Sequence, residues 1–409
     1  MMSTLVARIA ALAACLVLAG CSAFGSAQMN TGRSELAYDR DMPAITPVDW
    51  SARGTLLRTF DYPAFDFSEL PAGSRAVTMT YRSISGITGQ PTEVSGAAFI
   101  PPGTPPPGGW PVIGYAHGTV GVTPDCGPTS DPRLFGDLTS VAIQLQQGYA
   151  VVFTDYVGLG GALQTDERDP HPYLEPKSAA FNLIDAVRAA RAAVPELSTR
   201  WVAMGSSQGG ETAWATAEYF PAYGEGTDLL GAAAIVPALD MSQLAQGAQD
   251  STLTMDQLYL YPYVVTGLAA VDSSINPDDY LHGALRENRT ALIACRSSSP
   301  NAKGELGQSL ASADTRPSSP EAADRLARLL SAYALPQQPT QTPILAIYGG
   351  QDDTVPPAWT EVAMGRACAL GDTVMRVRME GEGHTLDPGA TLGQWLSDRF
   401  AGLPATGNC

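Results

Sequence analysis

Short runs of apolar and β-branched residues, separated by stretches of mixed pattern, recur along most of the chain. Between several of them, apolar residues return at helical spacing, as in 178–194 and 358–370. Such alternation predicts an α/β protein with a mostly parallel, doubly wound sheet and right-handed crossovers. The eight runs that we predict as strands are 76–84, 93–100, 111–116, 150–154, 201–204, 232–236, 344–348 and 374–379.

The alternation is interrupted between the sixth and seventh predicted strands. Residues 241–342 are rich in Ser, Gln and Ala, and they contain helical patterns at 255–268 and 320–335. A loop of this length without structure is unusual in a compact domain. We therefore predict a helical lid or cap insertion here, with the core domain formed by residues 51–240 and 343–409.

The N-terminal residues have the pattern of an export signal. Arg8 precedes an apolar run at 9–18, and Leu18-Ala19-Gly20 stands directly before Cys21. The run is shorter than the roughly 20 residues that span a bilayer. The ending is that of a lipobox, so we predict a lipoprotein signal peptide over residues 1–20 and a lipid anchor on Cys21.

A simple secretory signal, cut near Ala23 or Ala27, is the alternative. In either case residues 21–50 are polar and aperiodic, which is typical of a tether. We expect an exported protein, either attached to the membrane of the cell envelope through Cys21 or secreted.

Charge and composition exclude several classes of function. The net charge is −17, and no basic cluster is visible, which argues against nucleic-acid partners. No His or Cys cluster has the spacing of metal ligands, and no Gly-rich nucleotide loop is present. We therefore predict no metal and no cofactor.

Cysteine usage indicates disulfides. Beyond Cys15 and Cys21, the chain has Cys126, Cys295, Cys368 and Cys409, and an even count in an exported chain suggests two disulfides with three connectivities. We favour Cys126–Cys295, which would tie a loop to the insertion, and Cys368–Cys409, which would pin the C-terminal region. Free buried thiols are the alternative.

The stretch Gly205-Ser206-Ser207-Gln208-Gly209 follows the fifth predicted strand and precedes a helix-compatible segment at 211–218. Strand, Gly-x-Ser-x-Gly and helix together form the nucleophile elbow of a serine hydrolase, in which a sharp turn exposes the serine hydroxyl. Ser207, rather than Ser206, is the predicted nucleophile because it holds the central place between two glycines.

A serine nucleophile needs a base that removes its proton. His384 follows the last predicted strand, where this architecture presents its base. The other three histidines have less suitable places: His282 lies in the insertion, His171 in a Pro-rich loop and His117 before the nucleophile.

The orienting acid should follow the first strand after the insertion. There the spacing Gly-x-x-Asp-x-x-Val-Pro selects Asp352, with Asp353 as the alternative. The order Ser, Asp, His is that of the α/β-hydrolases.

An oxyanion formed on acyl attack needs preorganised N–H donors. We predict the backbone amide of Gln208, at the start of a helix, and that of Thr119, in the loop after the third strand, with Gly118 as the alternative to Thr119. We expect the His117 side chain to play a supporting role.

At these residues the chain resembles the secretory lipase family of α/β-hydrolases, known from fungi and actinobacteria. The family implies hydrolysis of carboxylic esters, often acylglycerols, an insertion lid and two disulfides. The resemblance runs from about residue 54 to the C-terminus and is carried by Tyr81-Arg82-Ser83, Val94-Ser95-Gly96, Trp110-Pro111, His117-Gly118-Thr119, Cys126, Thr154-Asp155-Tyr156, Gly158-Leu159-Gly160, Asp185-Ala186-Val187-Arg188-Ala189-Ala190, the elbow, Asp352 and His384.

Candidate substrate-pocket residues are Tyr156 and Tyr173, in the segment after the fourth strand, and Leu258 and Tyr261, in the insertion. Packing of the core is the alternative role for each of them.

The sequence as a whole predicts a serine carboxylic-ester hydrolase that acts on small-molecule or lipid esters through an acyl-enzyme. An acyltransferase or peptidase on the same scaffold is the alternative within enzymes. A lipid-binding lipoprotein without catalysis is the alternative outside them.

Overall fold

The computed structural model of the protein describes residues 38–60, 65–161, 171–296 and 306–409. In these residues nine strands form one sheet, in the order β1-β2-β3-β5-β4-β6-β7-β8-β9. Neighbours from β1 to β5 are antiparallel, and those from β5 through β4 to β9 are parallel. The strands are β1 (Leu56–Phe60), β2 (Arg75–Ile84), β3 (Pro91–Ile100), β4 (Trp110–Ala116), β5 (Ala150–Thr154), β6 (Leu197–Ser206), β7 (Asp228–Ile235), β8 (Ile344–Gly349) and β9 (Val374–Met379).

The mostly parallel, doubly wound α/β sheet is confirmed, but the prediction of eight strands was wrong by one. The additional strand, β1, lies at the edge of the sheet and pairs only with β2 among the described residues. Its side chains are half-buried or exposed, so it lacks the apolar run by which buried strands are recognised.

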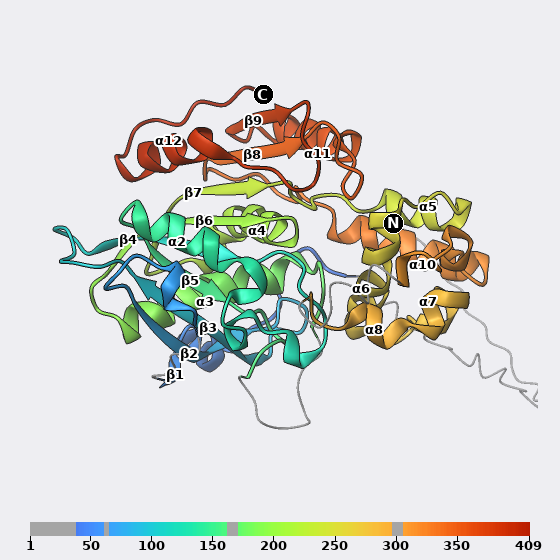
Figure 1. The fold of residues 1–409 in the computed structure, drawn as a ribbon, viewed down its shortest axis with the longest axis horizontal. Coiled ribbons are helices and arrows are strands. Elements are labelled where there is room, and N and C mark those ends of the chain that lie inside the picture. Colours follow the sequence, from blue (N-terminus) through green and yellow to red (C-terminus); the bar gives the residue numbers. More distant parts are fainter. Residues whose placement is uncertain (1–37, 61–64, 162–170, 297–305) are drawn as a thin grey trace, which may run out of the picture. The chain divides into compact units, whose positions relative to one another are not determined.

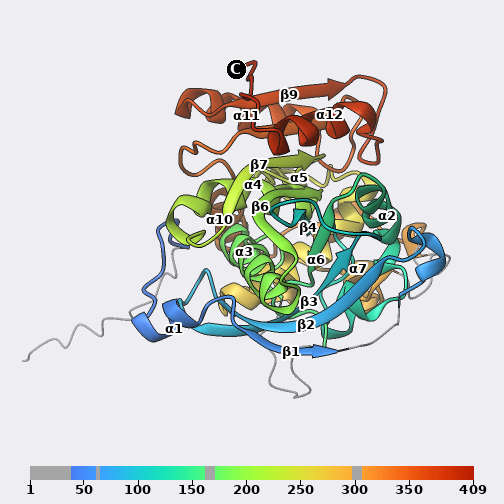
Figure 2. The same cartoon turned by 90° about the vertical axis from the view of Figure 1, so that its left-hand side faces the viewer.

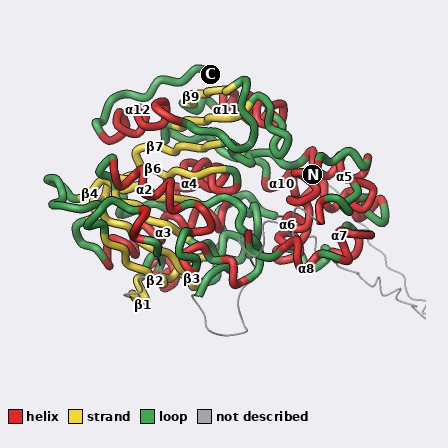
Figure 3. Tube along the Cα trace, in the orientation of Figure 1, coloured by secondary structure: helices red, strands yellow, loops and turns green. Residues whose placement is uncertain are grey.

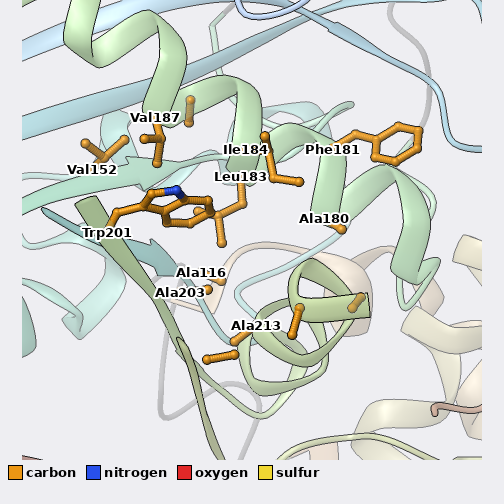
Figure 4. Close-up of a cluster of buried hydrophobic side chains, with 14 of the residues drawn as sticks. Ala116, Val152, Ala180, Phe181, Leu183, Ile184, Val187, Trp201, Ala203 and Ala213 are labelled. Atoms are coloured by element: carbon orange, nitrogen blue, oxygen red, sulfur yellow. The ribbon is translucent and has the colours of Figure 1, made fainter. Parts of the chain in front are cut away.

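Helices cover both faces of the sheet (Figure 2). On one face lie α3 (Pro176–Ala193), α4 (Gln208–Tyr223) and α11 (Pro357–Leu370), and on the other lie α2 (Leu138–Gln146) and α12 (Gly389–Phe400). The side chains of successive β6 residues point alternately to the two faces of the sheet, and both faces are buried. Trp201 packs with Leu183 and Val187 of α3 (Figure 4), whereas Val202 belongs to the cluster under α2 and α12.

A second group of helices is inserted between β7 and β8. Figures 1 and 3 show these helices together at one end of the sheet, without strands among them. Their apolar side chains, among them Leu258 and Tyr261, form one cluster with core-domain residues such as Tyr173 and Val355. The inserted helices are α5 (Gln243–Asp250), α6 (Met255–Val271), α7 (Gly283–Glu287), α8 (Arg289–Ile293) and α10 (Pro320–Tyr333).

Among the described residues, no helix combines the length and apolar character that crossing a membrane requires. The predicted signal peptide and Cys21 lie outside the described residues.

The described part of the predicted tether, residues 38–50, is packed against the core. It leads into the short helix α1 (Pro47–Ala52). Lys177 in the first turn of α3 donates hydrogen bonds of 2.6 Å to the carbonyl oxygens of Asp39 and Asp41. Tyr38 donates to the Glu175 carboxylate at 2.5 Å. Met42, Ile45 and Trp50 also pack against the core. The stretch is thus held by backbone carbonyls and a few scattered apolar side chains, neither of which gives a periodic hydrophobic pattern.

The structure contains the disulfides Cys126–Cys295 and Cys368–Cys409, which is the favoured one of the three connectivities. The first joins the loop after β4 to the end of α8. Backbone bonds strengthen this junction, from Val122 N to the Ile293 carbonyl at 3.3 Å and from Arg296 N to the Val120 carbonyl at 2.6 Å. The inserted helices are therefore anchored next to the carboxyl end of β4.

Candidate active site

Ser207 occupies the sharp turn between β6 and α4. Its backbone has φ 57° and ψ −116°, a conformation that is costly for a residue with a side chain. A Cβ on Gly205 would lie 2.4 Å from the Ala116 carbonyl oxygen, and one on Gly209 would lie 1.9 Å from the same atom. Only glycine fits at either position, because the turn presses directly against the end of β4.

The Ser207 hydroxyl is the first member of a hydrogen-bonded series. His384 Nε2 lies 2.8 Å from Ser207 Oγ, and His384 Nδ1 lies 2.8 Å from Asp352 Oδ2. Because the carboxylate can only accept, Nδ1 carries the imidazole proton and Nε2 is left to accept from the serine. The arrangement suits removal of the serine proton.

Backbone amides hold the Asp352 carboxylate in place. Asp352 is 3% exposed, and its second oxygen, Oδ1, accepts from Thr354 N at 2.9 Å and Val355 N at 2.8 Å. Asp352 therefore contacts the imidazole, whereas the carbonyl of the alternative, Asp353, accepts a bond from Thr254 at the start of α6.

The other three histidines, all within the described residues, lie away from the serine hydroxyl. His282 forms a hydrogen bond with the Arg316 carbonyl within the insertion. His171 is buried and belongs to the chain segment that connects β5 with α3. His117 is fully buried beside the Tyr156 ring, where burial lowers its pKa to about 4, and its Nδ1 lies 2.6 Å from the Gly118 carbonyl. Of the four, His384 is the one that reaches Ser207.

Two loops bring backbone N–H groups to the elbow. Gly118 lies close enough that an added Cβ would be 3.9 Å from the Ser207 Cβ. The amides of Gly118, Thr119 and Gln208 donate to no other residue in the described part of the chain, and Gln208 is the first residue of α4. Free amides at a helix N-terminus favour negative charge. The arrangement can therefore accept an oxyanion.

All four candidate substrate-pocket residues are buried. Tyr261 donates to the Thr315 carbonyl at 3.1 Å inside the insertion, where Leu258 also packs. The Tyr156 hydroxyl donates to the His117 carbonyl at 3.1 Å, and the Tyr173 hydroxyl lies 2.5 Å from Thr119 Oγ1. Contact of these residues with a substrate stays a prediction.

A cavity of about 570 Å³ lies between α2 and α12. Gly205 and Ser206 of the elbow contribute to its lining, as does Gln144, whose amide oxygen has no partner among the described residues. Ser207 and His384 are not among the lining residues. The cavity therefore adjoins the elbow but does not surround the Ser207 hydroxyl.

Comparison with known proteins agrees with this architecture. Residues 133–277 match the model of the secretory lipase family. The esterase LipA of Xanthomonas oryzae, described as rice cell wall degrading, is similar in structure, with a TM-score of 0.63, 23% identity, and coverage of 86% of this chain and 96% of that one. Lipase A of Candida antarctica has a TM-score of 0.66 at 14% identity, with coverage of 88% and 86%. A separate comparison with curated proteins found no match.

The matched residues run from the loop before α2 to the end of α6 and include the elbow and Gln208. Asp352, His384 and Thr119 lie outside them, so their assignment depends on the geometry described above. The predicted resemblance to the secretory lipase family is confirmed over residues 133–277, and the chain has the α/β-hydrolase fold.

Proposed function

We propose that the protein is a serine carboxylic-ester hydrolase, a lipase or esterase, with Ser207, His384 and Asp352 as its catalytic triad. The observation that carries this proposal is the pair of 2.8 Å contacts that join Ser207 Oγ to His384 and His384 to Asp352. The family match and the α/β-hydrolase fold support the same reaction class.

The proposed reaction proceeds through an acyl-enzyme. Ser207 Oγ attacks the ester carbonyl carbon while His384 Nε2 takes the hydroxyl proton, and Asp352 stabilises the resulting imidazolium. The negative oxygen of the tetrahedral intermediate accepts hydrogen bonds from the Gln208 amide and from Thr119 or Gly118. His384 then gives its proton to the leaving alcohol, and water, deprotonated by the same imidazole, releases the acid.

We further propose that the inserted helices form a lid over this site. Two contacts support the proposal. Thr254, the N-cap of α6, donates to the Asp353 carbonyl at 2.8 Å in the loop that carries Asp352. The Cys126–Cys295 disulfide ties the end of α8 to the loop that carries Thr119. The insertion is thus attached to both sides of the proposed site.

Export is also part of the proposal. The family whose model matches is named for secretory enzymes, and the sequence of residues 1–21 has the pattern of a lipoprotein signal. We propose that Cys21 carries the lipid anchor of the mature protein.

The decisive experiment compares Ser207→Ala with the matched control Ser206→Ala on p-nitrophenyl esters of increasing acyl length. Ser207→Ala should remove turnover and labelling by a fluorophosphonate probe, whereas Ser206→Ala keeps both. Circular dichroism checks that both variants are folded. Retained turnover in Ser207→Ala, or a label located on another residue of the wild type, would refute the assignment.

The same assays separate the competing functions. Transfer of the acyl group to an added alcohol in preference to water would identify an acyltransferase, and cleavage of a peptide in preference to esters would identify a peptidase. A folded wild type that neither turns over esters nor reacts with the probe would indicate a lipid-binding protein.

A further inference from the structure

His171, Pro172 and Tyr173, called here the 171–173 segment, lie between β5 and α3 and are buried next to the elbow. His171 is 4% exposed and Tyr173 is 2% exposed. Each makes a side-chain hydrogen bond to a residue that is far away in the sequence. These two residues are Gln208, whose amide we propose as one oxyanion donor, and Thr119, whose amide is the first choice for the other, with Gly118 as the alternative.

His171 holds the Gln208 side chain. Its Nδ1 lies 2.9 Å from the Val157 carbonyl oxygen, and its Nε2 lies 3.0 Å from Gln208 Nε2. Since a carbonyl can only accept, Nδ1 bears the proton and Nε2 accepts from the Gln208 amide group. Burial lowers the pKa of His171 to about 3, which is consistent with a neutral ring in this role.

Tyr173 holds Thr119. The Tyr173 hydroxyl lies 2.5 Å from Thr119 Oγ1. Thr119 lies outside helices and strands, and its backbone N–H and carbonyl make no hydrogen bond to the rest of the described chain. Its side-chain bond to Tyr173 is therefore the polar contact that fixes the direction of the Thr119 amide.

We propose that the 171–173 segment is a brace that positions both oxyanion donors, His171 through Gln208 and Tyr173 through Thr119. This inference rests on the proposed ester hydrolysis and adds two positioning residues to it. Only Pro172 stands between His171 and Tyr173, so this short segment sets the separation of one donor at the start of α4 and one in the loop after β4. Preorganised donors of this kind stabilise the transition state more than the bound substrate.

The brace is itself packed from two sides. The Tyr156 ring stacks on His171 with centroids 5.9 Å apart and an interplanar angle of 14°. From the insertion, α6 approaches so closely at Gly267 that an added Cβ would lie 2.5 Å from the Tyr173 Cβ. The segment is thus clamped between the core and the inserted helices, so its side chains have little freedom to move.

Removal of single hydroxyl groups tests the contact between Tyr173 and Thr119. Tyr173→Phe and Thr119→Val should each lower kcat for p-nitrophenyl acetate by about tenfold to a hundredfold, with KM changed by less than about twofold. The kcat of the double variant should be no lower than that of the less active single variant, because each substitution removes the same hydrogen bond. Tyr263→Phe is the matched control: its ring lies 6.0 Å from that of Tyr173, but its hydroxyl donates to the Ala294 carbonyl.

Substitution of His171 by each of the two amide residues tests its contact with Gln208. His171→Gln places an acceptor near the former Nε2 and should keep most of the wild-type kcat. The shorter side chain in His171→Asn can replace the bond to the Val157 carbonyl but does not extend to Gln208. This variant should therefore lower kcat by about tenfold or more. In both variants the pH profile of kcat should keep its shape, because neither substitution changes a residue of the proposed triad. Unfolding in urea shows whether the two variants are equally stable.

The outcomes separate this inference from the proposed function. If the wild type shows no turnover that depends on Ser207, the proposed function fails. If the wild type is active and Tyr173→Phe and His171→Asn keep its kcat, only the brace is refuted. Equal loss of kcat in both His171 variants, or losses that multiply in the Tyr173 and Thr119 double variant, would likewise overturn it.

Discussion

Replacing Gly209 by alanine perturbs the closest contact in the candidate site. The new Cβ would lie 1.9 Å from the Ala116 carbonyl oxygen and 2.6 Å from its carbon, whereas ordinary contact begins at 3.4 Å. The start of α4 and the end of β4 must therefore separate by roughly 1.5 Å, the difference between 3.4 and 1.9. Each element carries a proposed oxyanion donor, Gln208 on α4 and Thr119 just beyond β4, so their separation widens the oxyanion site.

Displacement of a catalytic group by about 1 Å costs on the order of a hundredfold in rate, and overpacking costs about 1–3 kcal/mol in stability. We expect kcat for a p-nitrophenyl ester to fall by about a hundredfold and the free energy of unfolding to fall by that amount. The matched control is Gly365→Ala in α11, where an added Cβ meets no atom within 4 Å.

The control should keep the wild-type kcat and gain about 0.5–1 kcal/mol, because alanine is the better helix former. Stopped-flow or steady-state kinetics and urea unfolding, run on the same preparations, measure both quantities. A Gly209→Ala variant with wild-type kcat and wild-type stability would refute the reasoning, because the elbow would then tolerate the side chain that its geometry excludes.

Three other predictions concern the acid, a disulfide and a buried histidine. Asp352→Asn should lower kcat by up to about 10⁴-fold, whereas Asp353→Asn should change it by less than about threefold; equal effects would contradict the choice of Asp352. Replacing Cys368 and Cys409 by serine opens a loop with a sequence separation of 41 and should cost about 4 kcal/mol by the chain-entropy relation, measured by urea unfolding with activity retained at low temperature. Burial lowers the pKa of His171 to about 3 from 6.5. Below pH 6.5 the unfolded state therefore binds a proton that the folded state does not bind, and the free energy of unfolding decreases as the pH decreases. Between about pH 6.5 and about pH 5.5, His171→Gln should therefore lose about 1 kcal/mol less stability than the wild type; equal losses in the two proteins would show that another group titrates.

Several features of this protein could be predicted from local sequence alone. Buried parallel strands such as β6 and β8 appear as continuous apolar runs, and the elbow appears as glycines at fixed spacing, because both depend on residues that are neighbours in the chain. The position of His384 after the last strand and of Asp352 after the preceding one follows from the order of the elements. Each of these signals lies within one element and its adjoining turn.

Other features depend on contacts that no local pattern reports. β1 is an exposed edge strand, so it has no apolar run. Residues 38–50 bind the core through backbone carbonyls and through scattered apolar side chains such as Met42 and Ile45, which form no periodic pattern. The Pro-rich loop around His171 carries no periodic signal at all. Its buried bond to Gln208 becomes visible only when β5, α3 and α4 are assembled.

The sequence by itself therefore determined the reaction class to propose and the residues proposed to carry it, because the elbow, the proposed base and the proposed acid occupy positions set by chain order. The tertiary structure decided which contacts hold the proposed oxyanion donors. The bonds from His171 to Gln208 and from Tyr173 to Thr119 join residues separated by 37 and 54 positions. Hydrogen bonds at such separations depend on the packing of several elements at once, and that packing is a property of the folded chain.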